Sequence, residues 1–428
     1  MDRPKSISRR RVLAAGTAGI VGAALPVAGQ NPDQAARPKV PADPTKVQGP
    51  LSTDVGSRSP FEKPKRVSLG ARRTSSLTPL QDLDGIITPS DLHFERHHGG
   101  VPAIDPQQYS LLIHGMVDRP LVFTLEDLRR FPGRSIIRAM ECSGNGGRVY
   151  RREGNQTGAP GARTVRAGVE TDLTPQEIDG LTSTSEWTGV PLATLLREAG
   201  ASPKATWFLA EGSDAAVMTR SIPIAKAWDD ALIAYGQNGE PLRPEQGYPA
   251  RLFLPGVEGN ASIKWLRRIE VSDQPFMTRE ETSKYTDPLP DGTARIFSLD
   301  MDAKSLITEP SFPDKLTGPG WWEIRGIAWS GRGRITRVDV SADGGKTWQQ
   351  AKLDDPVLPK CHTRFRLPWE WKGGEAMIAS RATDETGYVQ PTYDVLLAAR
   401  GPATAYHFNH IRAWKVHADG TVKFGGGL

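Results

Sequence analysis

A thiol stands at the end of an apolar segment and is followed at once by a glycine-rich stretch. Ser135–Met140 (SIIRAM) indicates a strand, which leads through Glu141 into Cys142-Ser-Gly-Asn-Gly-Gly-Arg148. Glycine has no Cβ and tolerates positive φ, so such a loop lets the backbone approach a large ligand closely. A thiolate there can be a soft-metal ligand or a nucleophile. The alternative that these residues leave open is a buried cysteine beside a tight turn.

The chain has only two cysteines, Cys142 and Cys361. Two cysteines exclude a disulfide scaffold, a four-cysteine zinc site and an iron–sulfur cluster held by cysteines. A Cys-x-x-Cys-His motif is absent from the sequence, which argues against a covalently attached c-type haem. A single Cys142–Cys361 disulfide remains an alternative. Because Cys361 and His362 are too few ligands for a metal site, Cys361 is expected to be a structural thiol.

Composition favours short strands and loops, because the chain carries 44 glycines and 35 prolines. Residues 79–288 mix strand and helix patterns. From 289 to 399, β-patterns such as Trp322–Trp329 and turns such as Asp343-Gly-Gly345 predict an immunoglobulin-like antiparallel β-sandwich. The expected fold class is therefore α+β.

Within residues 79–288, we expect strands at Tyr109–Gly115, Ser135–Met140, Arg251–Leu254 and Ile263–Val271. Helices are expected at Thr124–Phe131, with Thr124 as N-cap, and at Pro191–Glu198, which would be stopped by Gly200.

The N-terminus has the pattern of an export signal. Ser8-Arg-Arg-Arg11 precedes an apolar run, Val12–Ala28, that is short and weakly apolar for a membrane span. It predicts a twin-arginine signal peptide over residues 1–29, a periplasmic location and a cofactor acquired before export. Residues 30–78, rich in Pro, Ser and charge, are expected to form an extended arm. Residues 400–428 are expected to be a C-terminal tail, in which His407 and His410 would be solvated.

The charge balance gives no reason to expect a nucleic-acid partner. The net charge is +5, from 54 Lys and Arg against 49 Asp and Glu. Residues 1–29 hold five bases and one acid, so the rest of the chain is nearly neutral. A neutral body does not provide the basic surface on which nucleic-acid binding depends.

Two further segments accompany the cysteine loop. Arg96-His-His-Gly-Gly-Val-Pro102 places a cation and two imidazoles beside glycines, and alone it could be a zinc loop, a phosphate loop or a polar turn. The most specific stretch continues from Ala234–Leu242 through Gly247-Tyr-Pro-Ala-Arg251 to Pro255-Gly-Val-Glu-Gly-Asn-Ala-Ser-Ile-Lys-Trp265.

Taken in order, these motifs resemble the sulfite oxidase family of molybdenum enzymes. The resemblance spans residues 86–398 and rests on R-x-H at 96–98, C-x-G-N at 142–145, G-[FY]-P-x-R at 247–251 and K-W-L at 264–266. The β-sandwich, with its DGG-x-x-W turn at 343–348, then resembles the family's dimerisation domain. The leader, the CSGNGG loop and the segment Tyr406–Lys415 resemble the SoxC branch, the sulfane dehydrogenase subunits of the bacterial Sox sulfur-oxidation system.

The resemblance implies a molybdenum–molybdopterin cofactor (Moco), bound by residues 79–288. Cys142 would be the thiolate ligand of the metal. Arg96 would contact anionic sulfur, and Tyr285 would be the active-site tyrosine that hydrogen-bonds substrate. Gln246 stands where animal enzymes have histidine, and His97 where they have asparagine. The implied cofactor-binding residues are His97, His98, Cys142, Ser143, Asp214, Gln246, Arg251, Ser262, Ile263 and Lys264.

The implied activity is molybdenum-dependent oxidation of a sulfane sulfur bound to a carrier protein. Since this chain lacks a haem motif, the electrons would pass to a separate c-type cytochrome subunit like SoxD. The substrate would be a sulfur-carrier protein like SoxYZ, and a second copy of the chain would pair through the β-sandwich. No nucleic acid and no membrane span are expected.

The cysteine loop also departs from its relatives. Gly146 and Gly147 stand where animal and plant sulfite oxidases have two arginines, which should widen the approach to the metal and favour carrier-bound sulfur, unless Arg148 fills the gap. Two alternatives remain: a free-sulfite dehydrogenase of the same family, with a cytochrome c acceptor, and a non-catalytic binding module that has lost its metal.

Overall fold

The computed structural model describes residues 51–69, 74–149, 170–289, 291–401 and 404–428. The expected signal peptide and the first part of the arm lie outside these ranges. The chain divides into two units, residues 1–63 and 64–428. In the first unit, the described residues 51–63 form bends and turns with exposed side chains, Phe61 among them. Within the described ranges, no helix is both long and apolar enough to cross a membrane.

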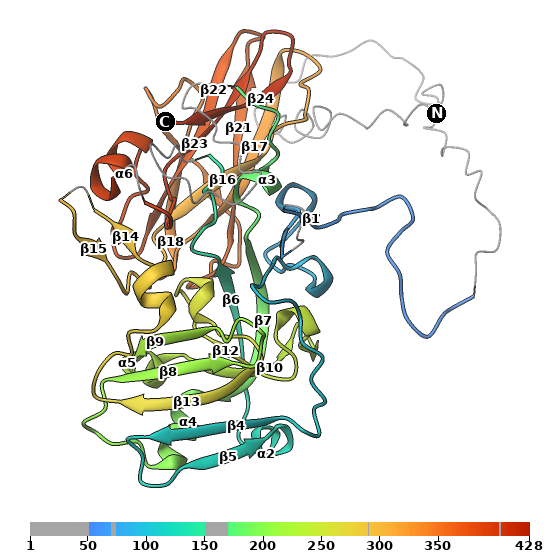
Figure 1. Cartoon of the computed structure of the whole chain (residues 1–428). Helices are drawn as coiled ribbons and strands as arrows, with labels where there is room; N and C mark the ends of the chain where they lie inside the picture. Colours follow the sequence, from blue (N-terminus) through green and yellow to red (C-terminus); the bar gives the residue numbers. More distant parts are fainter. Residues whose placement is uncertain (1–50, 70–73, 150–169, 290, 402–403) are drawn as a thin grey trace, which may run out of the picture. The chain divides into compact units, whose positions relative to one another are not determined.

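The first domain of the second unit contains two five-stranded sheets and one three-stranded sheet (Figure 1). One five-stranded sheet has the order β5-β4-β13-β8-β9, with β4 and β13 parallel. The other has the order β11-β10-β7-β6, with β12 also paired to β10. The elements are β4 (Ser110–Gly115), β5 (Leu121–Thr124), α2 (Leu125–Arg130), β6 (Arg134–Glu141), α3 (Pro175–Asp179), β7 (Thr182–Pro191), α4 (Leu192–Ala199), β8 (Trp207–Gly212), β9 (Thr219–Pro223), α5 (Ala225–Asp229), β10 (Leu232–Gln237), β11 (Glu240–Pro241), β12 (Arg251–Phe253) and β13 (Leu266–Ser272).

Local sequence explains the helices that flank these sheets. Thr124 caps α2, since its hydroxyl accepts from the Asp127 amide while the Asp127 carboxylate accepts from the Thr124 amide. Helix α4 begins after Pro191 and ends at Gly200, which adopts a left-handed conformation (φ 70°). Both expected helices are confirmed.

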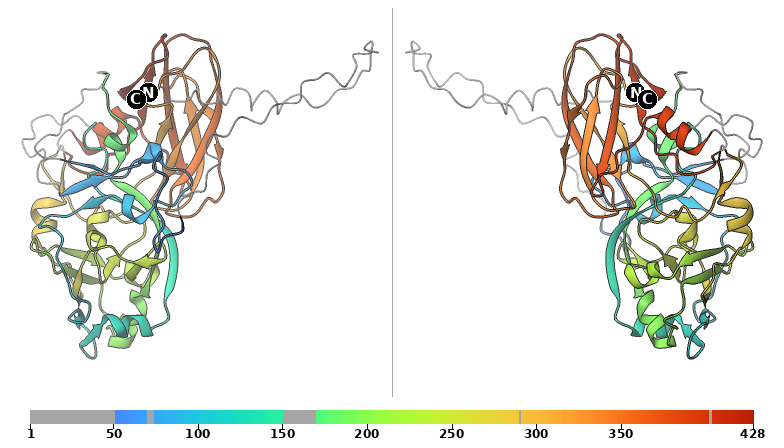
Figure 2. Two further views of the ribbon diagram at one scale, coloured as in Figure 1. Left: turned by 90° about the vertical axis from the view of Figure 1, so that its right-hand side faces the viewer. Right: turned by 90° about the vertical axis from the view of Figure 1, so that its left-hand side faces the viewer.

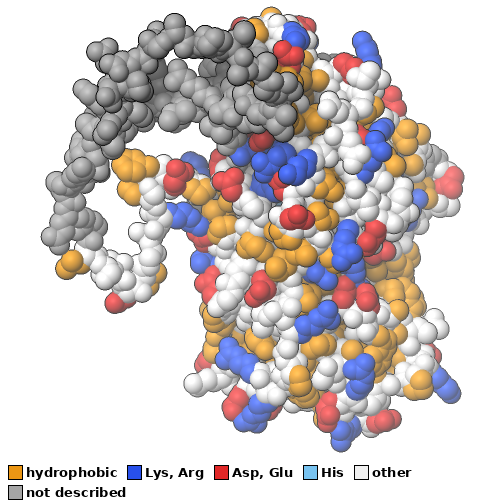
Figure 3. All heavy atoms as spheres, turned by 180° about the vertical axis from the view of Figure 1, so that it is seen from behind, with side chains coloured by type: hydrophobic (Ala, Val, Ile, Leu, Met, Phe, Trp, Pro, Cys, Tyr) orange, Lys and Arg blue, Asp and Glu red, His pale blue; other side chains and the backbone are white. Residues whose placement is uncertain are grey.

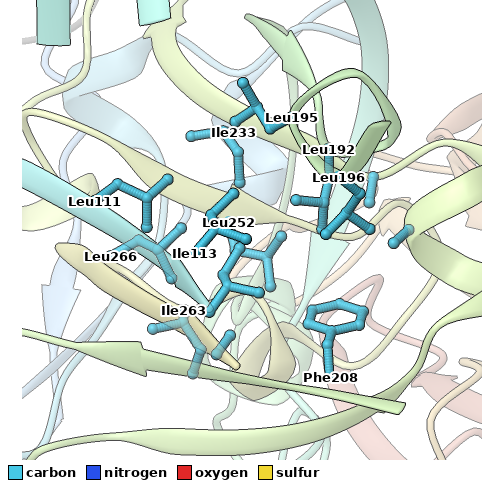
Figure 4. Close-up of a cluster of buried hydrophobic side chains, with 14 of the residues drawn as sticks. Leu111, Ile113, Leu192, Leu195, Leu196, Phe208, Ile233, Leu252, Ile263 and Leu266 are labelled. Atoms are coloured by element: carbon cyan, nitrogen blue, oxygen red, sulfur yellow. The ribbon is translucent and has the colours of Figure 1, made fainter. Parts of the chain in front are cut away.

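The core of this domain forms where α4 packs against the two five-stranded sheets. The apolar face of α4 repeats at three- and four-residue spacing, and its side chains meet those of β4, β8, β10 and β13 (Figure 4). The central members are Leu111, Ile113, Leu192, Leu195, Leu196, Phe208, Ile233, Leu252, Ile263 and Leu266.

The strand expected at Ile263–Val271 starts later than predicted, at Leu266. Trp265 has a φ of 52°, which is incompatible with a strand, and its indole N–H donates to the Pro244 carbonyl. The chain therefore turns before β13, and Ile263 and Lys264 lie on the turn rather than in the sheet.

The end of the expected arm belongs to this domain. Strand β1 (Val67–Ser68) pairs with β2 (Ser75–Leu77), and β2 pairs with β3 (Glu95–Arg96) in the three-stranded sheet. Leu77 at the end of β2 is buried. This sheet fixes the backbone that carries Arg96.

The second domain is a sandwich of two antiparallel sheets, drawn in orange and red in Figure 2. The sheets have the orders β16-β17-β21-β20 and β19-β18-β22-β23-β24, and Trp329, Trp371 and Trp414 are buried in its core. With the first domain, this confirms the α+β class. The elements are β14 (Asp287–Pro288), β15 (Ala294–Arg295), β16 (Lys304–Glu309), β17 (Gly320–Trp329), β18 (Ile335–Ser341), β19 (Gln349–Gln350), β20 (Lys352–Leu353), β21 (Thr363–Trp371), β22 (Ala376–Asp384), α6 (Tyr393–Arg400), β23 (Arg412–Val416) and β24 (Val422–Gly427).

The expected C-terminal tail, residues 400–428, contains two of these strands. β23 pairs with β22, and β24 pairs with β23, so the tail completes the second sheet of the sandwich. The expectation of solvated histidines is wrong, since His407 and His410 are both buried. The tail is short and polar in sequence, but pairing with β22 satisfies its backbone groups.

Candidate functional site

A pocket of about 640 Å³, counting its open mouth, gathers most of the candidate residues. Eleven of the predicted site residues line this pocket: Arg96, His97, His98, Cys142, Asp214, Gln246, Arg251, Ser262, Ile263, Lys264 and Tyr285. Its other lining residues, which the sequence analysis did not single out, are Phe94, Met140, Met218, Gly259, Asn260 and Trp265.

The cysteine loop begins where β6 leaves the sheet. The Cys142 amide donates to the Leu181 carbonyl (3.0 Å), and the Asn145 amide donates back to the Cys142 carbonyl (2.9 Å). Burial raises the pKa of Cys142, although the Gly144 amide and the charge of Arg96 lower it in part. A metal ligand must be deprotonated, so metal binding at this thiol would release its proton.

The second cysteine lies apart from this loop. Cys142 and Cys361 are both free thiols, so the alternative of a disulfide between them is not realised. Cys361 is buried and its Sγ donates to the Ile137 carbonyl at 3.1 Å. Burial raises its pKa to about 12, so Cys361 stays a neutral structural thiol.

Ser143 is the one predicted residue that does not line the pocket. It is fully buried, its Oγ accepts from Asn260 Nδ2 at 2.8 Å, and its carbonyl accepts from the His407 amide at 2.8 Å. Ser143 therefore fixes the loop beside the pocket. Asn260 is a lining residue that the sequence analysis quoted within a motif without giving it a role.

Arg96, His98 and Tyr285 form a connected chain along the pocket wall. Arg96 Nη2 lies 3.4 Å from His98 Nδ1, and His98 Nε2 lies 3.1 Å from the Tyr285 hydroxyl. Burial, and next the charge of Arg96, lower the pKa of His98 to about 4, so the ring is neutral at pH 7. Since Arg96 can only donate, His98 accepts at Nδ1 and carries its proton on Nε2.

This tautomer fixes the role of the phenol. His98 donates to Tyr285, so the phenolic hydrogen is left for a ligand in the pocket. Burial is the main cause that raises the pKa of Tyr285, which therefore remains a donor. Tyr285 follows a short π-helical turn, Glu280–Lys284, and its ring lies 5.1 Å from that of Tyr406.

Two cations near the pocket lack a carboxylate among their hydrogen-bond partners in the described part of the chain. Arg251 donates to the carbonyls of Gln246 (2.9 Å) and Ser262 (2.8 Å), and Lys264 donates to the carbonyl of Glu245 (2.8 Å). Burial lowers the pKa of Arg251 to about 9, and burial together with repulsion from Arg251 lowers that of Lys264 to about 7. Cations that are shielded from water and lack a carboxylate partner bind an anionic group such as a phosphate favourably.

Lys264 predicts a pH dependence of stability for the cofactor-free protein. Its pKa is about 7 when folded and near 10.5 when unfolded, so the unfolded chain binds more protons between these values. Stability relative to a Lys264→Met variant should therefore rise as pH increases from 7 to 10, as denaturant midpoints would show. Parallel curves for the two proteins would contradict this prediction.

Acceptors line the same pocket. Asn260 Oδ1 is buried without a hydrogen-bond partner among the described residues, and Asp214 Oδ1 accepts from the Met218 amide at 3.0 Å. His97 holds its ring between Glu95 (3.1 Å) and the Gly100 amide (3.1 Å). A buried acceptor, the buried Arg251, the half-buried Lys264 and a thiol suit a ligand with N–H donors, a phosphate and a soft metal, which are the groups of molybdopterin.

The structure corrects the expected role of the two loop glycines. A Cβ on Gly146 would clash with Arg412 Nη2, and one on Gly147 would lie 3.0 Å from the Phe408 ring. Neither glycine lines the pocket; both lie against Arg412 and Phe408 of the C-terminal segment, so their lack of a side chain does not widen the pocket there. Arg148 does not fill the pocket, because it pairs with Glu177 at 3.7 Å.

Comparisons with known proteins agree with this site. Residues 98–280 match the family described as "Oxidoreductase molybdopterin binding domain", and residues 295–413 match the "Mo-co oxidoreductase dimerisation domain". Chicken sulfite oxidase is 32% identical over 79% of this chain and 72% of its own length, and human mitochondrial sulfite oxidase is 32% identical over 84% and 68%. A nitrate reductase of Phaseolus vulgaris is 33% identical, but the match covers only 38% of it.

A solved structure is similar over nearly the whole chain. The sulfane dehydrogenase SoxCD from Paracoccus pantotrophus contains a chain that is 43% identical, with a TM-score of 0.82, over 93% of this chain and 99% of that one.

Fold and pocket together define a molybdopterin-dependent oxidoreductase. The chain belongs to the sulfite oxidase family and carries out sulfite oxidase-type molybdenum oxidoreduction. Cys142 is the residue suited to hold the metal, while Arg251, Lys264, Asp214 and Asn260 are suited to hold the pterin and its phosphate.

Proposed function

We propose that this enzyme oxidises a sulfane sulfur carried on a protein thiol and passes the electrons to a c-type cytochrome. The observation that carries the proposal is the 43% identity to a sulfane dehydrogenase chain over nearly full length, against 32% for sulfite oxidases. The SoxCD assembly supports a SoxD-like subunit as the partner of this chain, which we propose to be the cytochrome acceptor. The proposed substrate is a SoxYZ-like carrier. The runner-up is free sulfite, oxidised to sulfate with the same kind of acceptor.

The residues of this chain supply binding and orientation. Arg96, whose guanidinium lines the pocket near Cys142, attracts a terminal sulfur or its oxyanion. Tyr285, held as a donor by His98, hydrogen-bonds the same group. The bound molybdenum cofactor supplies the oxidation, in which each oxygen atom that sulfur gains from water releases two protons and two electrons. A cytochrome takes these electrons one at a time.

Turnover on two substrates tests the proposal. With cytochrome c as acceptor, kcat/KM should be higher on a carrier protein bearing a thiol-bound sulfane than on free sulfite. The unloaded carrier is the control for electrons that come from the thiol itself. Efficient sulfite turnover with no activity on the loaded carrier would promote the runner-up, and protein purified without molybdenum or pterin would favour the binding module.

Arg96 gives a prediction of its own. Arg96→Gln should lower kcat/KM about 10- to 150-fold, because a charge-assisted contact of about 1.5–3 kcal/mol is lost. Arg148→Gln is the control, since Arg148 lies near the loop but pairs with Glu177 outside the pocket. Wild-type kcat/KM in the Arg96 variant, or an equal loss in the Arg148 variant, would contradict this role.

We also propose that the protein is a two-fold dimer through its sandwich. Residues 295–413 match a dimerisation domain, and the Trp321 side chain on β17 is 53% exposed. An exposed tryptophan is apolar area that a partner would cover. Sedimentation at micromolar concentration should give a dimer, and a monomer alone would count against it.

Localisation is proposed from the leader alone. The twin arginines Arg9 and Arg10 favour export to the periplasm in folded form. Changing both to lysine should retain the protein in the cytoplasmic fraction, and undiminished periplasmic protein would refute the signal.

Figure 3 shows basic and acidic side chains interspersed on one face, which offers no single-sign surface there for nucleic acid.

A further inference from the structure

A buried group of four charged side chains lies behind the cysteine loop and joins the two domains. Glu141 ends β6, directly before Cys142, and Asp179 ends α3; Lys304 begins β16 and Arg412 begins β23. Lys304 Nζ lies 2.7 Å from Glu141 and 3.2 Å from Asp179, and Arg412 Nε lies 3.1 Å from Asp179. Two carboxylates thus balance two cations, and all four side chains are almost fully buried.

The charges of this group depend on one another. Burial alone would raise the pKa of Asp179, yet Arg412 and Lys304 lower it overall. Removing one member of a buried ionic group leaves its partner charged and unpaired, which is strongly destabilising. Loss of Lys304 would leave Glu141 without its cation, whereas Asp179 would keep Arg412.

Hydrogen bonds carry this arrangement into the cysteine loop. The Glu141 carboxylate accepts from Trp329 Nε1 at 2.6 Å and from Asn145 Nδ2 at 2.9 Å, as well as from Lys304. The backbone N–H of Asn145 in turn donates to the Cys142 carbonyl, so the turn that contains the thiol is fixed at both ends. Lys304 and Trp329 belong to the second domain, although the pocket is lined by residues of the first.

The C-terminal segment supplies a second attachment. The His407 amide donates to the Ser143 carbonyl, and His407 Nε2 lies 3.3 Å from Glu258. His407 adopts a φ of 60°, a conformation that residues other than glycine rarely accept. Arg412 and Phe408 contact the loop at Gly146 and Gly147, where any larger residue would be obstructed.

We propose that the second domain positions the Cys142 thiolate. Lys304, Trp329 and Arg412 are positioning residues that hold residues 141–147 through Glu141, Asp179 and Asn145, so the geometry of the metal ligand and retention of the cofactor depend on the sandwich. The inference rests on the proposed role of Cys142 as the metal ligand.

Lys304→Met in the full-length holoenzyme tests the proposal, since the methionine side chain matches that of lysine as far as Cε but lacks the ammonium group. The Mo(V) electron paramagnetic resonance g-values should shift, because they report on the sulfur ligands. The affinity for molybdenum, followed as metal lost over successive dialysis steps, should fall by about 10- to 100-fold, the usual effect of losing a residue that supports a metal ligand. Amide hydrogen exchange in residues 141–149 should accelerate, a readout that does not depend on activity.

Lys226→Met is the matched control. Lys226 also forms a shielded ion pair, with Asp230, and donates to the Pro255 carbonyl, but it does not contact the cysteine loop. This variant should leave the g-values and the exchange of residues 141–149 unchanged, even if it lowers thermal stability. An equal change in both variants would mean a general loss of stability and would overturn the proposal.

A milder variant covers the case in which Lys304→Met fails to fold. Trp329→Phe removes the hydrogen bond to Glu141 while keeping an aromatic ring in the core, and should shift the g-values in the same direction by less. Wild-type g-values, molybdenum content and loop exchange in a folded variant would refute the proposal. If Cys142→Ser instead left the wild-type signal unaltered, the ligand assignment itself would fail, which is a different result.

Discussion

Cys142→Ser is expected to lower turnover by more than about 100-fold while leaving the fold intact. Loss of a residue that merely supports a metal ligand typically costs about 10- to 100-fold, and loss of the ligand should cost more. An alkoxide is a harder and far more basic ligand than a thiolate, so the electronic structure of the metal must change. Turnover per molybdenum, with circular dichroism to verify folding, is the measurement.

The second cysteine provides a matched control for this substitution. Cys361→Ser makes the same chemical change at a buried thiol that donates to the Ile137 carbonyl and lies outside the pocket. This variant should keep wild-type turnover per molybdenum. Near-wild-type turnover in a molybdenum-loaded Cys142→Ser variant would refute the assignment of Cys142 as ligand.

Local patterns predicted the elements of the first domain well. The N-cap at Thr124, the helix stop at Gly200 and the strand that leads into Cys142 depend on residues close together in the chain, so the sequence alone is sufficient to place them. The motif resemblance brought together Arg96, Cys142 and Tyr285, which are distant in sequence but line one pocket.

Features set by distant contacts were missed. The positive φ of Trp265 delays the start of the predicted strand to Leu266, and the indole of Trp265 donates to the carbonyl of Pro244, a residue of an earlier segment. Gly146 and Gly147 suggested an open entrance, but the space beside them is taken by Arg412 and Phe408, more than 250 residues later in the sequence. Periodicity within a segment contains no information about such partners.

The C-terminal strands illustrate the same limit. β24 reads as a run of glycines after Val422, Lys423 and Phe424, and a glycine-rich strand has a weak local signal. It forms because β23 offers a paired edge, and Phe424 then packs against Trp414 with ring centroids 5.5 Å apart. The C-terminal segment therefore forms the edge of the sheet because it pairs with neighbouring strands, and not because its residues have a high strand propensity.

Arg251→Met is expected to weaken cofactor binding by roughly 30-fold to several thousand-fold. Arg251 is buried, and its hydrogen bonds to oxygen within the described part of the chain go to carbonyl groups, so an anionic ligand would supply its ionic partner. Truncating one side of a buried charge pair typically costs about 2–5 kcal/mol, which corresponds to that range of affinity. Cofactor retained on dialysis, followed by pterin fluorescence, would measure the loss.

Thermal unfolding separates this effect from ordinary damage to the core. A ligand stabilises the folded state according to its affinity, so the Tm difference between loaded and cofactor-free protein should shrink in the Arg251 variant. Arg364→Met is the control, because Arg364 is also shielded and donates to the carbonyls of Leu83 and Gly85, but it does not line the pocket. That variant should lower the Tm of both forms by the same amount. If Arg251→Met likewise lowered both equally and retained its cofactor, the buried guanidinium would be a structural group, and the anion in this pocket would have to be held by Lys264 instead.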